Sequence, residues 1–354
     1  MSRVLLFAQD PGGAAVLAAI AGRLVPSDPT VMVVAHPLAE PAFARAGVSA
    51  RPLTDWFDTL PVDEDAWLVW LGDRGVTHVV CSLSSRYRDL TNCHLVTASR
   101  RRGVPTLGFL DAWVGFDRFV DDHGEPRFLP DVAGCIDEYC RGRLVALGMD
   151  EAVVRAVGHP ALPARSTPVR RGPGETLRVL LVSQPRARDR SFISIFETMA
   201  GSARLLDRLV AGCDGMDPQR PRLGFRAHPK ESAPVSIPST MERMPAVSDL
   251  PLYQDHDVLI GLTSMVLVEA ALAGRVVVRL RVPELEDAID EVDPPFPLGL
   301  EVRRLSELDA VLRTAAAHVR AGEAPADQQL PDLRESLGRA EAWAREFIGE
   351  RGGV

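Results

Sequence analysis

One stretch, residues 257–284 (DVLIGLTSMVLVEAALAGRVVVRLRVPE), constrains the fold more than any other part of the chain. Residues 258–260 form a short apolar run that predicts a buried strand. Residues 265–273 are apolar throughout except for Glu269, which predicts a buried helix. Gly274 stands where helices commonly end, and a second apolar run follows it. The stretch therefore predicts a strand–helix–strand unit of an α/β fold.

The turn between that strand and that helix carries two hydroxyl side chains, Thr263 and Ser264. The free N–H groups and the dipole of a helix N-terminus favour an anion, and the hydroxyls would add donors. The alternative is that Ser264 only caps the helix. Burying the charged side chain of Glu269 in an apolar helix would cost free energy unless it faces water or a polar ligand. The sequence leaves open which of the two it faces.

The length and charge of the chain limit the classes of protein to consider. The 354 residues predict one or two domains, with two of about 150–190 residues preferred. Apolar residues make up 46% and charged residues 25%, as in ordinary globular proteins. A net charge of −8 argues against a nucleic-acid partner, which calls for a basic footprint. The basic triplet at 100–102 is expected at the end of a helix, where the dipole favours it.

Cysteine usage and the N-terminus predict a cytoplasmic protein. The five cysteines are scattered and form no CxxC pair, which favours reduced thiols. Only five apolar residues precede the Gln9-Asp10-Pro11 turn, which is too few for a signal peptide. Residues 258–278 are long enough to span a bilayer, but Glu269 and Arg275 interrupt them. No integral membrane segment is therefore expected.

The first half of the chain begins with strand, glycine turn and helix. An apolar strand at 4–8 leads into Asp10-Pro11-Gly12-Gly13, and an alanine- and leucine-rich helix follows at 14–24. This is how a Rossmann-like half begins, although the turn is not GxGxxG and supports a dinucleotide site only weakly. Gly12 and Gly13 either let the helix pack closely on the strand or let a ligand approach its N-terminus beside Asp10.

More strands and helices alternate up to residue 158. Strands are expected at 31–35, 76–82, 106–110 and 153–158, and helices at 90–102 and 136–147. Asp111 and Trp113 follow one of these strands, at the edge where α/β sheets place ligand groups. Trp113 could instead join Phe116 and Phe119 in a small aromatic core. His159 either contacts a ligand or packs at a hinge.

Residues 164–175 are rich in Pro, Gly, Arg and Ser and are the best candidate for a connection between domains. The expected domains are 1–165 and 176–330, and an amphipathic helix within 331–354 should pack back on the first. The second half is expected to have a strand at 177–182 before Gln184, a long helix at 192–209, a strand at 223–227 before His228-Pro229-Lys230, and a helix at 305–319. Asp63-Glu64-Asp65 is expected to be a solvated loop.

These motifs together resemble the GT-B superfamily. Residues 225–230 (FRAHPK) are similar to the HP motif of bacterial sialyltransferases, capsule-type Kdo transferases and CDP-glycerol glycerophosphotransferases, and Thr263-Ser264 resembles the Ser/Thr motif paired with it. Residues 269–284 resemble the C-terminal half of non-hydrolysing UDP-GlcNAc 2-epimerases. Residues 157–160 (VGHP) are similar to the Gly-Asn/His-Pro turn that precedes the hinge in such proteins. The resemblance implies two Rossmann-like domains facing a central cleft. It also implies that both motifs contact a donor nucleotide and its phosphate, and that Glu269 binds the ribose.

The chain departs from these families at two motifs. The epimerase GTRPE-like turn is replaced by residues 9–13, and the sialyltransferase Asp/Glu-Asp-Gly motif is not evident. The base must therefore be sought among the chain's own carboxylates. Asp10 is the first choice and Asp111 the second, and for either the alternative is hydrogen bonding within its own turn.

The leading hypothesis is a metal-independent glycosyltransferase that moves a sugar from a nucleotide-activated donor to a carbohydrate or other hydroxyl acceptor, with surface polysaccharide or glycoconjugate synthesis as one setting. The nucleotide-sugar is a substrate, so no cofactor and no metal are expected. A 2-epimerase and a non-catalytic nucleotide- or carbohydrate-binding relative are the alternatives. Neither the donor base, the sugar, the stereochemical outcome nor the oligomeric state is predicted. The expected catalytic residues are Asp10, Asp111 and His228, and the expected substrate-binding residues are Gly12, Gly13, Trp113, His159, Gln184, Lys230, Thr263, Ser264 and Glu269.

Overall fold

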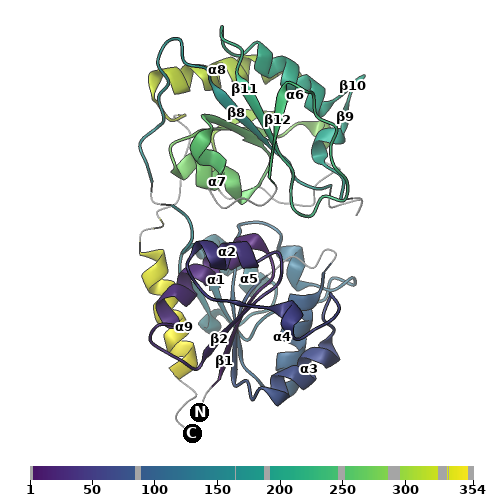
Figure 1. Ribbon diagram of the computed structural model, residues 1–354, viewed down its shortest axis with the longest axis vertical. Helices are drawn as coiled ribbons and strands as arrows, with labels where there is room; N and C mark the ends of the chain where they lie inside the picture. Colours follow the sequence, from purple (N-terminus) through teal and green to yellow (C-terminus); the bar gives the residue numbers. More distant parts are fainter. Residues whose placement is uncertain are drawn as a thin grey trace. The chain divides into compact units, whose positions relative to one another are not determined.

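The computed structural model describes residues 3–83, 89–163, 165–186, 192–245, 252–285, 296–325, 333 and 335–349. The chain divides into two compact units (Figure 1). Unit 1 comprises residues 1–162 and 333–354, and unit 2 comprises residues 163–332. Each unit contains a parallel sheet covered by helices, so the predicted two-domain α/β class is confirmed.

The sheet of unit 1 has seven parallel strands in the order β3-β2-β1-β4-β5-β6-β7. Its central strands are apolar and fully buried because helices cover both faces. The strand order reverses between β1 and β4, which is the place where open α/β sheets bind ligands. The strands are β1 (Val4–Ala8), β2 (Val31–Ala35), β3 (Arg51–Pro52), β4 (His78–Ser82), β5 (Thr106–Phe109), β6 (Val132–Cys135) and β7 (Val154–Ala156).

Successive side chains of β1 point to opposite faces of this sheet. Leu6 packs with residues of α1, α2 and α9, whereas Phe7 meets Trp67 of α3 at 5.4 Å between ring centroids, on the face where α3 also packs on α4 (Figure 1). The helices of unit 1 are α1 (Pro11–Leu24), α2 (Glu40–Arg45), α3 (Glu64–Asp73), α4 (Thr91–Arg102), α5 (Glu138–Ala146) and α9 (Ser336–Gly349).

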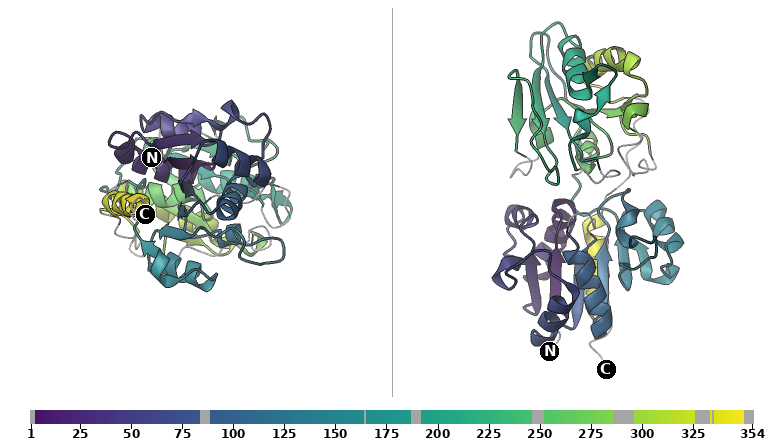
Figure 2. Two further views of the ribbon diagram at one scale, coloured as in Figure 1. Left: turned by 90° about the horizontal axis from the view of Figure 1, so that it is seen from below. Right: turned by 90° about the vertical axis from the view of Figure 1, so that its right-hand side faces the viewer.

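The last helix of the chain, α9, belongs to unit 1, where it lies beside α1 (Figure 2). Trp343 and Phe347 are buried in the same cluster as the first strands. The guanidinium of Arg155 stacks 3.4 Å from the centroid of the Trp343 ring and forms an ion pair with Glu346. The chain enters α9 beside Gly158, where an added Cβ would lie 2.0 Å from Ser336 Oγ, so only glycine fits there.

The sheet of unit 2 has six parallel strands in the order β12-β11-β8-β13-β14-β15, and its order reverses between β8 and β13. A separate antiparallel pair, β9 and β10, precedes α6. The strands are β8 (Arg178–Val182), β9 (Met199–Ala200), β10 (Ala203–Arg204), β11 (Arg222–Arg226), β12 (Met241–Met244), β13 (Val258–Gly261), β14 (Val276–Leu280) and β15 (Leu300–Val302).

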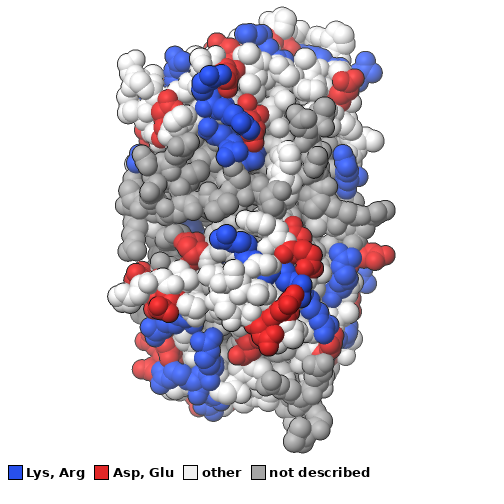
Figure 3. All heavy atoms as spheres, turned by 180° about the vertical axis from the view of Figure 1, so that it is seen from behind, with Lys and Arg blue, Asp and Glu red and all other residues white. Residues whose placement is uncertain are grey.

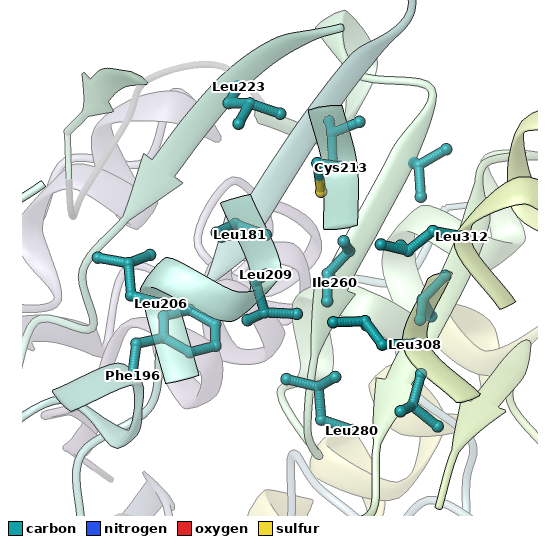
Figure 4. Close-up of a cluster of buried hydrophobic side chains, with 14 of the residues drawn as sticks. Leu181, Phe196, Leu206, Leu209, Cys213, Leu223, Ile260, Leu280, Leu308 and Leu312 are labelled. Carbon is teal, nitrogen blue, oxygen red and sulfur yellow. The ribbon is translucent and has the colours of Figure 1, made fainter. Parts of the chain in front are cut away.

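One face of this sheet packs against α6 (Leu205–Asp214) and α8 (Leu308–Ala321). Figure 4 shows Leu181 and Ile260 of the strands meeting Leu209 of α6 and Leu312 of α8. The third helix, α7 (Met265–Leu272), connects neighbouring parallel strands β13 and β14 and contributes no residue to that cluster. We assign α7 to the opposite face, as right-handed crossovers require (Figure 1).

Buried Asp257 fixes the segment that leads into unit 2. Its Oδ1 accepts a hydrogen bond from Arg171 Nε and its Oδ2 accepts one from the Arg178 amide, each at 2.9 Å. The Ser166 amide donates to the carbonyl of Leu272, the last residue of α7, and the Val169 amide donates to that of Gly274, two residues further on. The Pro- and Gly-rich segment after residue 164 is thus hydrogen-bonded to unit 2.

Two predicted elements are wrong. Residues 192–209 do not form one long helix, because the 3-10 turn Ile195–Glu197 and the β9–β10 hairpin precede α6. Ser194 Oγ accepts from the Phe196 amide and Gly201 adopts φ +69°, so local turns compete successfully with the helix. Residues 63–65 are not a loop, because Asp63 caps α3 by accepting from the Ala66 amide at 2.7 Å.

The elements that were not predicted are α2, α3, β3, β6, β9, β10, β12 and β15. Other short 3-10 turns are Leu53–Asp55, Phe116–Phe119, Glu151–Val153, Leu252–Asp255, Pro283–Leu285 and Leu305–Glu307. All five cysteines are free and buried, as expected.

The described surface has mixed charge. On the face shown in Figure 3, basic and acidic side chains are interspersed over both units. In the part of the chain that the structure covers, no helix combines the length and hydropathy needed to cross a membrane.

Candidate functional site

The reversal of strand order in unit 2 brings three strand ends together. Gln184 lies two residues beyond β8, Thr263 two residues beyond β13, and His228 two residues beyond β11, which is the other neighbour of β8. All three strands are parallel, so their carboxyl ends share one edge of the sheet. The structure therefore gathers three of the residues selected from the sequence at the position where such sheets bind ligands.

Gln184 and Thr263 hold each other across this point. Gln184 Nε2 donates to Thr263 Oγ1 at 3.0 Å, and Gln184 Oε1 accepts from the Thr263 amide at 2.8 Å. Both residues are buried, where a satisfied pair of hydrogen bonds defines one geometry. Because both polar ends of its amide are used in this way, Gln184 orients the turn after β13.

Ser264 follows directly, at the position preceding the first residue of α7. Its side chain makes no capping hydrogen bond, so the alternative that Ser264 merely caps the helix is not supported. The first turn of α7 contains no acidic residue that would compete with an anion. The partly exposed hydroxyl of Ser264 thus stands at the positive end of a helix dipole.

The hydrogen bonding of His228 fixes where its proton lies. The Lys230 amide donates to His228 Nδ1 at 3.1 Å, so in the neutral ring the proton is on Nε2. A neutral histidine in this tautomer presents Nε2–H as a donor. Both His228 and Lys230 are partly exposed.

Glu231, the next residue, was not singled out from the sequence. Neither of its carboxylate oxygens has a hydrogen bond of good geometry, although both are shielded from solvent. Burial raises the pKa of this carboxyl group, and the nearby Ser183 hydroxyl, the turn backbone at His228 and Arg243 offset part of the increase. The only sequence feature that could have pointed to Glu231 as a site residue is its position directly after His228-Pro229-Lys230.

Glu269 lies on the partly exposed side of α7. Burial and the negative charge of Glu269 together raise the pKa of the Tyr253 phenol to about 12. Glu269 therefore lies close to Tyr253, on the helix that begins at Ser264. Its predicted contact with a ribose stays a prediction.

In unit 1, the glycines after β1 make room for protein atoms. A Cβ on Gly12 would lie 2.5 Å from Asp111 Oδ2, and a Cβ on Gly13 would lie 2.4 Å from Ser82 Cβ. These distances support the close-packing alternative for both glycines. Asp10 occupies the N-cap position of α1, but its side chain makes no capping hydrogen bond. The carboxylate of Asp111 thus lies against the first turn of α1.

Asp111 is also paired with a buried arginine. Arg118 Nη1 lies 2.9 Å from Asp111 Oδ1, and the same guanidinium donates to the carbonyls of Leu83, Val114 and Gly115. The Asp111 carbonyl is 3.0 Å from Nε2 of His159, which donates to it. Burial lowers the pKa of His159, so this ring is neutral at pH 7 and serves to hold the loop.

Trp113 is buried, with 1% of its surface exposed. Its indole Nε1 donates to Asp137 Oδ2 at 2.6 Å, and Asp137 in turn caps α5. Phe116 and Phe119 are buried beside it in the chain. Trp113 therefore presents no surface to a ligand.

Gln9, a buried residue directly after β1, holds a second set of contacts in unit 1. Gln9 Nε2 donates to the Asp89 carbonyl, and Gln9 Oε1 accepts from the Asn92 amide at 2.7 Å. Burial alone would raise the pKa of Asp89, but His36 and Thr91 bond to its carboxylate and lower the value to about 2. These contacts tie the ends of β1 and β2 to the start of α4.

Comparison of the sequence with protein families and with curated proteins finds no match. Comparison of the structure with solved structures does find similar chains. A UDP-N-acetylglucosamine 2-epimerase (described as putative) from Listeria monocytogenes is 12% identical with a TM-score of 0.65, over 99% of this chain and 98% of that one. The UDP-GlcNAc 2-epimerase from Neisseria meningitidis bound to UDP-GlcNAc is 10% identical with a TM-score of 0.60, over 99% and 100%.

Glycosyltransferases are similar over the whole chain as well. The calicheamicin glycosyltransferase CalG4 is 15% identical with a TM-score of 0.52, over all of both chains. This chain has a GT-B fold. The resemblance inferred from the HP and Thr-Ser motifs is thereby confirmed for the fold. Sequence identities this low show a common fold and do not show a common function.

The sequence pointed to neither of two largely buried arginines that contact candidate residues or their turns. Arg279 of unit 2 donates to the Leu262 carbonyl beside Thr263, and Arg118 of unit 1 pairs with Asp111. A charged residue inside the apolar run of residues 276–280 was a usable signal for Arg279. Among the described residues, no group of three or more His, Cys, Asp or Glu side chains is arranged to hold a metal ion.

Proposed function

We propose that this GT-B protein is a glycosyltransferase that binds a nucleotide-activated sugar through unit 2 and transfers the sugar to a hydroxyl acceptor. The observation that carries the proposal is the Gln184–Thr263 pair across the reversal of strand order, directly before Ser264 and α7. The turn held by this pair brings the hydroxyl groups of Thr263 and Ser264 together with the N-terminus of α7. Hydroxyl donors beside a helix N-terminus suit the phosphate groups of a nucleotide.

The leaving group of the proposed reaction is a nucleoside phosphate, whose negative charge grows as the glycosidic bond breaks. His228 Nε2–H, the Lys230 ammonium group and the Ser264 hydroxyl are the proposed donors to it. Glu269 is the proposed acceptor for the ribose hydroxyls. Fixed donors of this kind stabilise developing charge without a metal ion, so activity is expected to persist in excess chelator.

The acceptor hydroxyl must lose a proton as the new bond forms. We propose Asp10 of unit 1 as the base, because it lies two residues beyond β1, at the edge of the sheet beside the reversal of strand order. Asp111 is the second candidate, but its Oδ1 is paired with Arg118 and its Oδ2 lies against Gly12 of α1. The proposed base thus follows the first strand of the chain.

Nucleotide binding is the direct test. Calorimetry with UDP, GDP and CMP should identify one nucleotide that binds, and Ser264→Ala or His228→Ala should weaken that binding by about 1–3 kcal/mol, because each removes a hydrogen bond to a charged group. Ser232→Ala, an exposed serine on the loop after His228, is the matched control and should change nothing. Unchanged affinity in both site variants would show that the phosphate lies elsewhere.

A 2-epimerase is the second candidate, and the higher TM-scores of the epimerase structures favour it. The two reactions differ in their products. With UDP-GlcNAc, a transferase releases UDP only in step with an acceptor, whereas an epimerase forms the 2-epimer of the same UDP-sugar. Nuclear magnetic resonance of the sugar protons, with and without a panel of glycoside acceptors, separates them. Binding without either product would identify a non-catalytic nucleotide-binding relative.

A further inference from the structure

Glu231 lies where the turn after β11 meets the segment that follows β8. Its amide donates to the His228 carbonyl at 3.0 Å, which closes the turn. The next amide, that of Ser232, donates to the Phe192 carbonyl at 2.8 Å. Because β8 and β11 are parallel neighbours, their carboxyl ends share the edge of the sheet at which the proposed donors to phosphate lie. Glu231 therefore belongs to the same edge.

The carboxyl group of Glu231 is enclosed by protein. Both of its oxygens are shielded from solvent, and neither has a hydrogen bond of good geometry. The Ser183 hydroxyl beside it is shared with the Ser194 hydroxyl, 2.5 Å away, whose oxygen also accepts from the Phe196 amide. An enclosed carboxylate without a full set of hydrogen bonds has a large desolvation cost, and binding a proton removes much of that cost.

Groups from three elements act on this carboxyl group. Burial has the largest effect and raises its pKa, and three groups offset part of the increase: the Ser183 hydroxyl after β8, the turn backbone at His228, and the positive charge of Arg243 on β12. His228 and Lys230 are the other titratable side chains of the turn. The protonation state of Glu231 is thus set by the charges at this edge, and a bound anion would change it.

A phosphate group at this edge adds negative charge. In the proposed function, His228 Nε2–H and the Lys230 ammonium group donate to the phosphate, and Lys230 directly precedes Glu231. Two negative groups that share a poorly solvated site repel each other, so the pKa of one of them rises. The linking phosphates of a nucleotide-sugar are esters that stay ionised near neutral pH, so the proton goes to the carboxyl group.

We propose that Glu231 is a further residue of the phosphate site, and that it takes up a proton when a nucleotide-sugar binds at His228 and Lys230. The inference rests on the proposed function, in which unit 2 binds a nucleotide. It adds a direction of pH dependence. Binding is strongest at a pH where Glu231 of the free protein already holds its proton, and it weakens as the pH rises and that proton is lost.

The experiment measures UDP-GlcNAc binding to the full-length protein by calorimetry from about pH 5 to pH 8, with the sugar of another nucleotide used if the wild type prefers it. Glu231→Gln is neutral at every pH and similar in size to the protonated side chain. It should bind about 10-fold more tightly than the wild type at the highest pH, since one unit of pKa shift is a tenfold change in affinity. The two affinities should converge at the lowest pH. Uridine, which has no phosphate, should bind both proteins equally.

Glu242→Gln is the matched control, because it removes the same charge from an exposed residue of β12. It should change the affinity by less than about 3-fold at every pH, as expected of a solvent-screened charge. A second measurement repeats the titration at the highest pH in buffers of different ionisation enthalpy. The heats should show that the wild type takes up a proton on binding and that Glu231→Gln does not.

Thermal unfolding of each variant establishes that it is folded, and the proton uptake of the wild type decides the matter if Glu231→Gln does not fold. Equal affinities of the wild type and Glu231→Gln over the whole pH range, weaker binding by Glu231→Gln, the same change for uridine, or no proton uptake by the wild type would each overturn the inference. A wild-type protein that binds no nucleotide or nucleotide-sugar would instead overturn the proposed function.

Discussion

At the scale of single residues, the two candidate bases of unit 1 have different surroundings. Asp111 is paired with Arg118, lies against Gly12 of α1, and accepts a hydrogen bond from His159 at its backbone carbonyl. Asp10 lies two residues beyond β1, beside the reversal of strand order. Asp111 therefore supports its loop, whereas the strand-end position of Asp10 is the reason for proposing it as the base.

This difference predicts the effect of Asp10→Asn. Turnover should fall by about 10²–10⁴, the usual loss on removing a general base, while the affinity for the donor nucleotide stays at the wild-type value because the proposed nucleotide contacts lie in unit 2. Initial rates with the identified donor and acceptor, together with calorimetry for the nucleotide, measure the two quantities separately.

Asp111→Asn serves as the comparison. It should lower the unfolding temperature of unit 1, because it removes the charge that pairs with Arg118 in a largely buried site. If Asp111→Asn abolishes turnover without affecting stability while Asp10→Asn is active, the roles of the two residues are reversed.

At the scale of elements, the decisive packing is that of α9 on unit 1. The helix comes from the end of the chain, yet Trp343 and Phe347 lie in one cluster with the first strands and α1. Phe347 also meets the His78 ring edge-on at 5.5 Å between centroids. The fold of unit 1 therefore requires residues that follow all of unit 2 in sequence.

Trp343→Ala should destabilise unit 1 by about 3–5 kcal/mol, because it removes a large buried ring and the platform on which Arg155 stacks. Urea unfolding followed by circular dichroism gives the free energy. Ala342→Ser, on the exposed face of the same helix, is the control and should change the free energy by less than about 0.5 kcal/mol. Equal effects of the two substitutions would mean that α9 does not stabilise unit 1.

At the scale of the whole molecule, each unit has a hydrophobic cluster among its described residues, and the two clusters share no residue. The cluster of unit 2 lies between its sheet and the helices α6 and α8, and that of unit 1 lies between its sheet and α1, α2 and α9. Separate cores allow separate unfolding and separate responses to ligands.

Scanning calorimetry should therefore resolve two unfolding transitions. A saturating nucleotide should raise the transition of unit 2 by mass action and leave that of unit 1 unchanged. Asp257→Ala assigns the unit 2 transition, because it removes a buried carboxylate that joins Arg171 to the start of β8, and Trp343→Ala assigns the other. One cooperative transition that shifts as a whole with nucleotide would contradict this independence.

The sequence by itself determined the elements whose signals are local. Apolar runs of four to six residues ended by Gly, Pro or polar residues predicted the central strands of both sheets, and the βαβ unit around residues 257–284 was predicted almost to the residue. The HP and Thr-Ser motifs also indicated the GT-B fold. These predictions succeeded because burial on both faces of a parallel sheet leaves a continuous apolar pattern in the strand itself.

Tertiary structure alone decided which side chains hold the site together. Gln184 and Thr263 are 79 positions apart and meet only because β8 and β13 are neighbours at the reversal of strand order. Likewise, Asp111 takes the space beside Gly12 because β5 lies two strands from β1. The expected helix at 192–209 failed for a local reason instead, because the Ser194 turn and the positive φ of Gly201 compete with the helix. The pattern of apolar residues in the sequence indicates whether a residue is buried. Which residue it contacts depends on the order of the strands in the sheet.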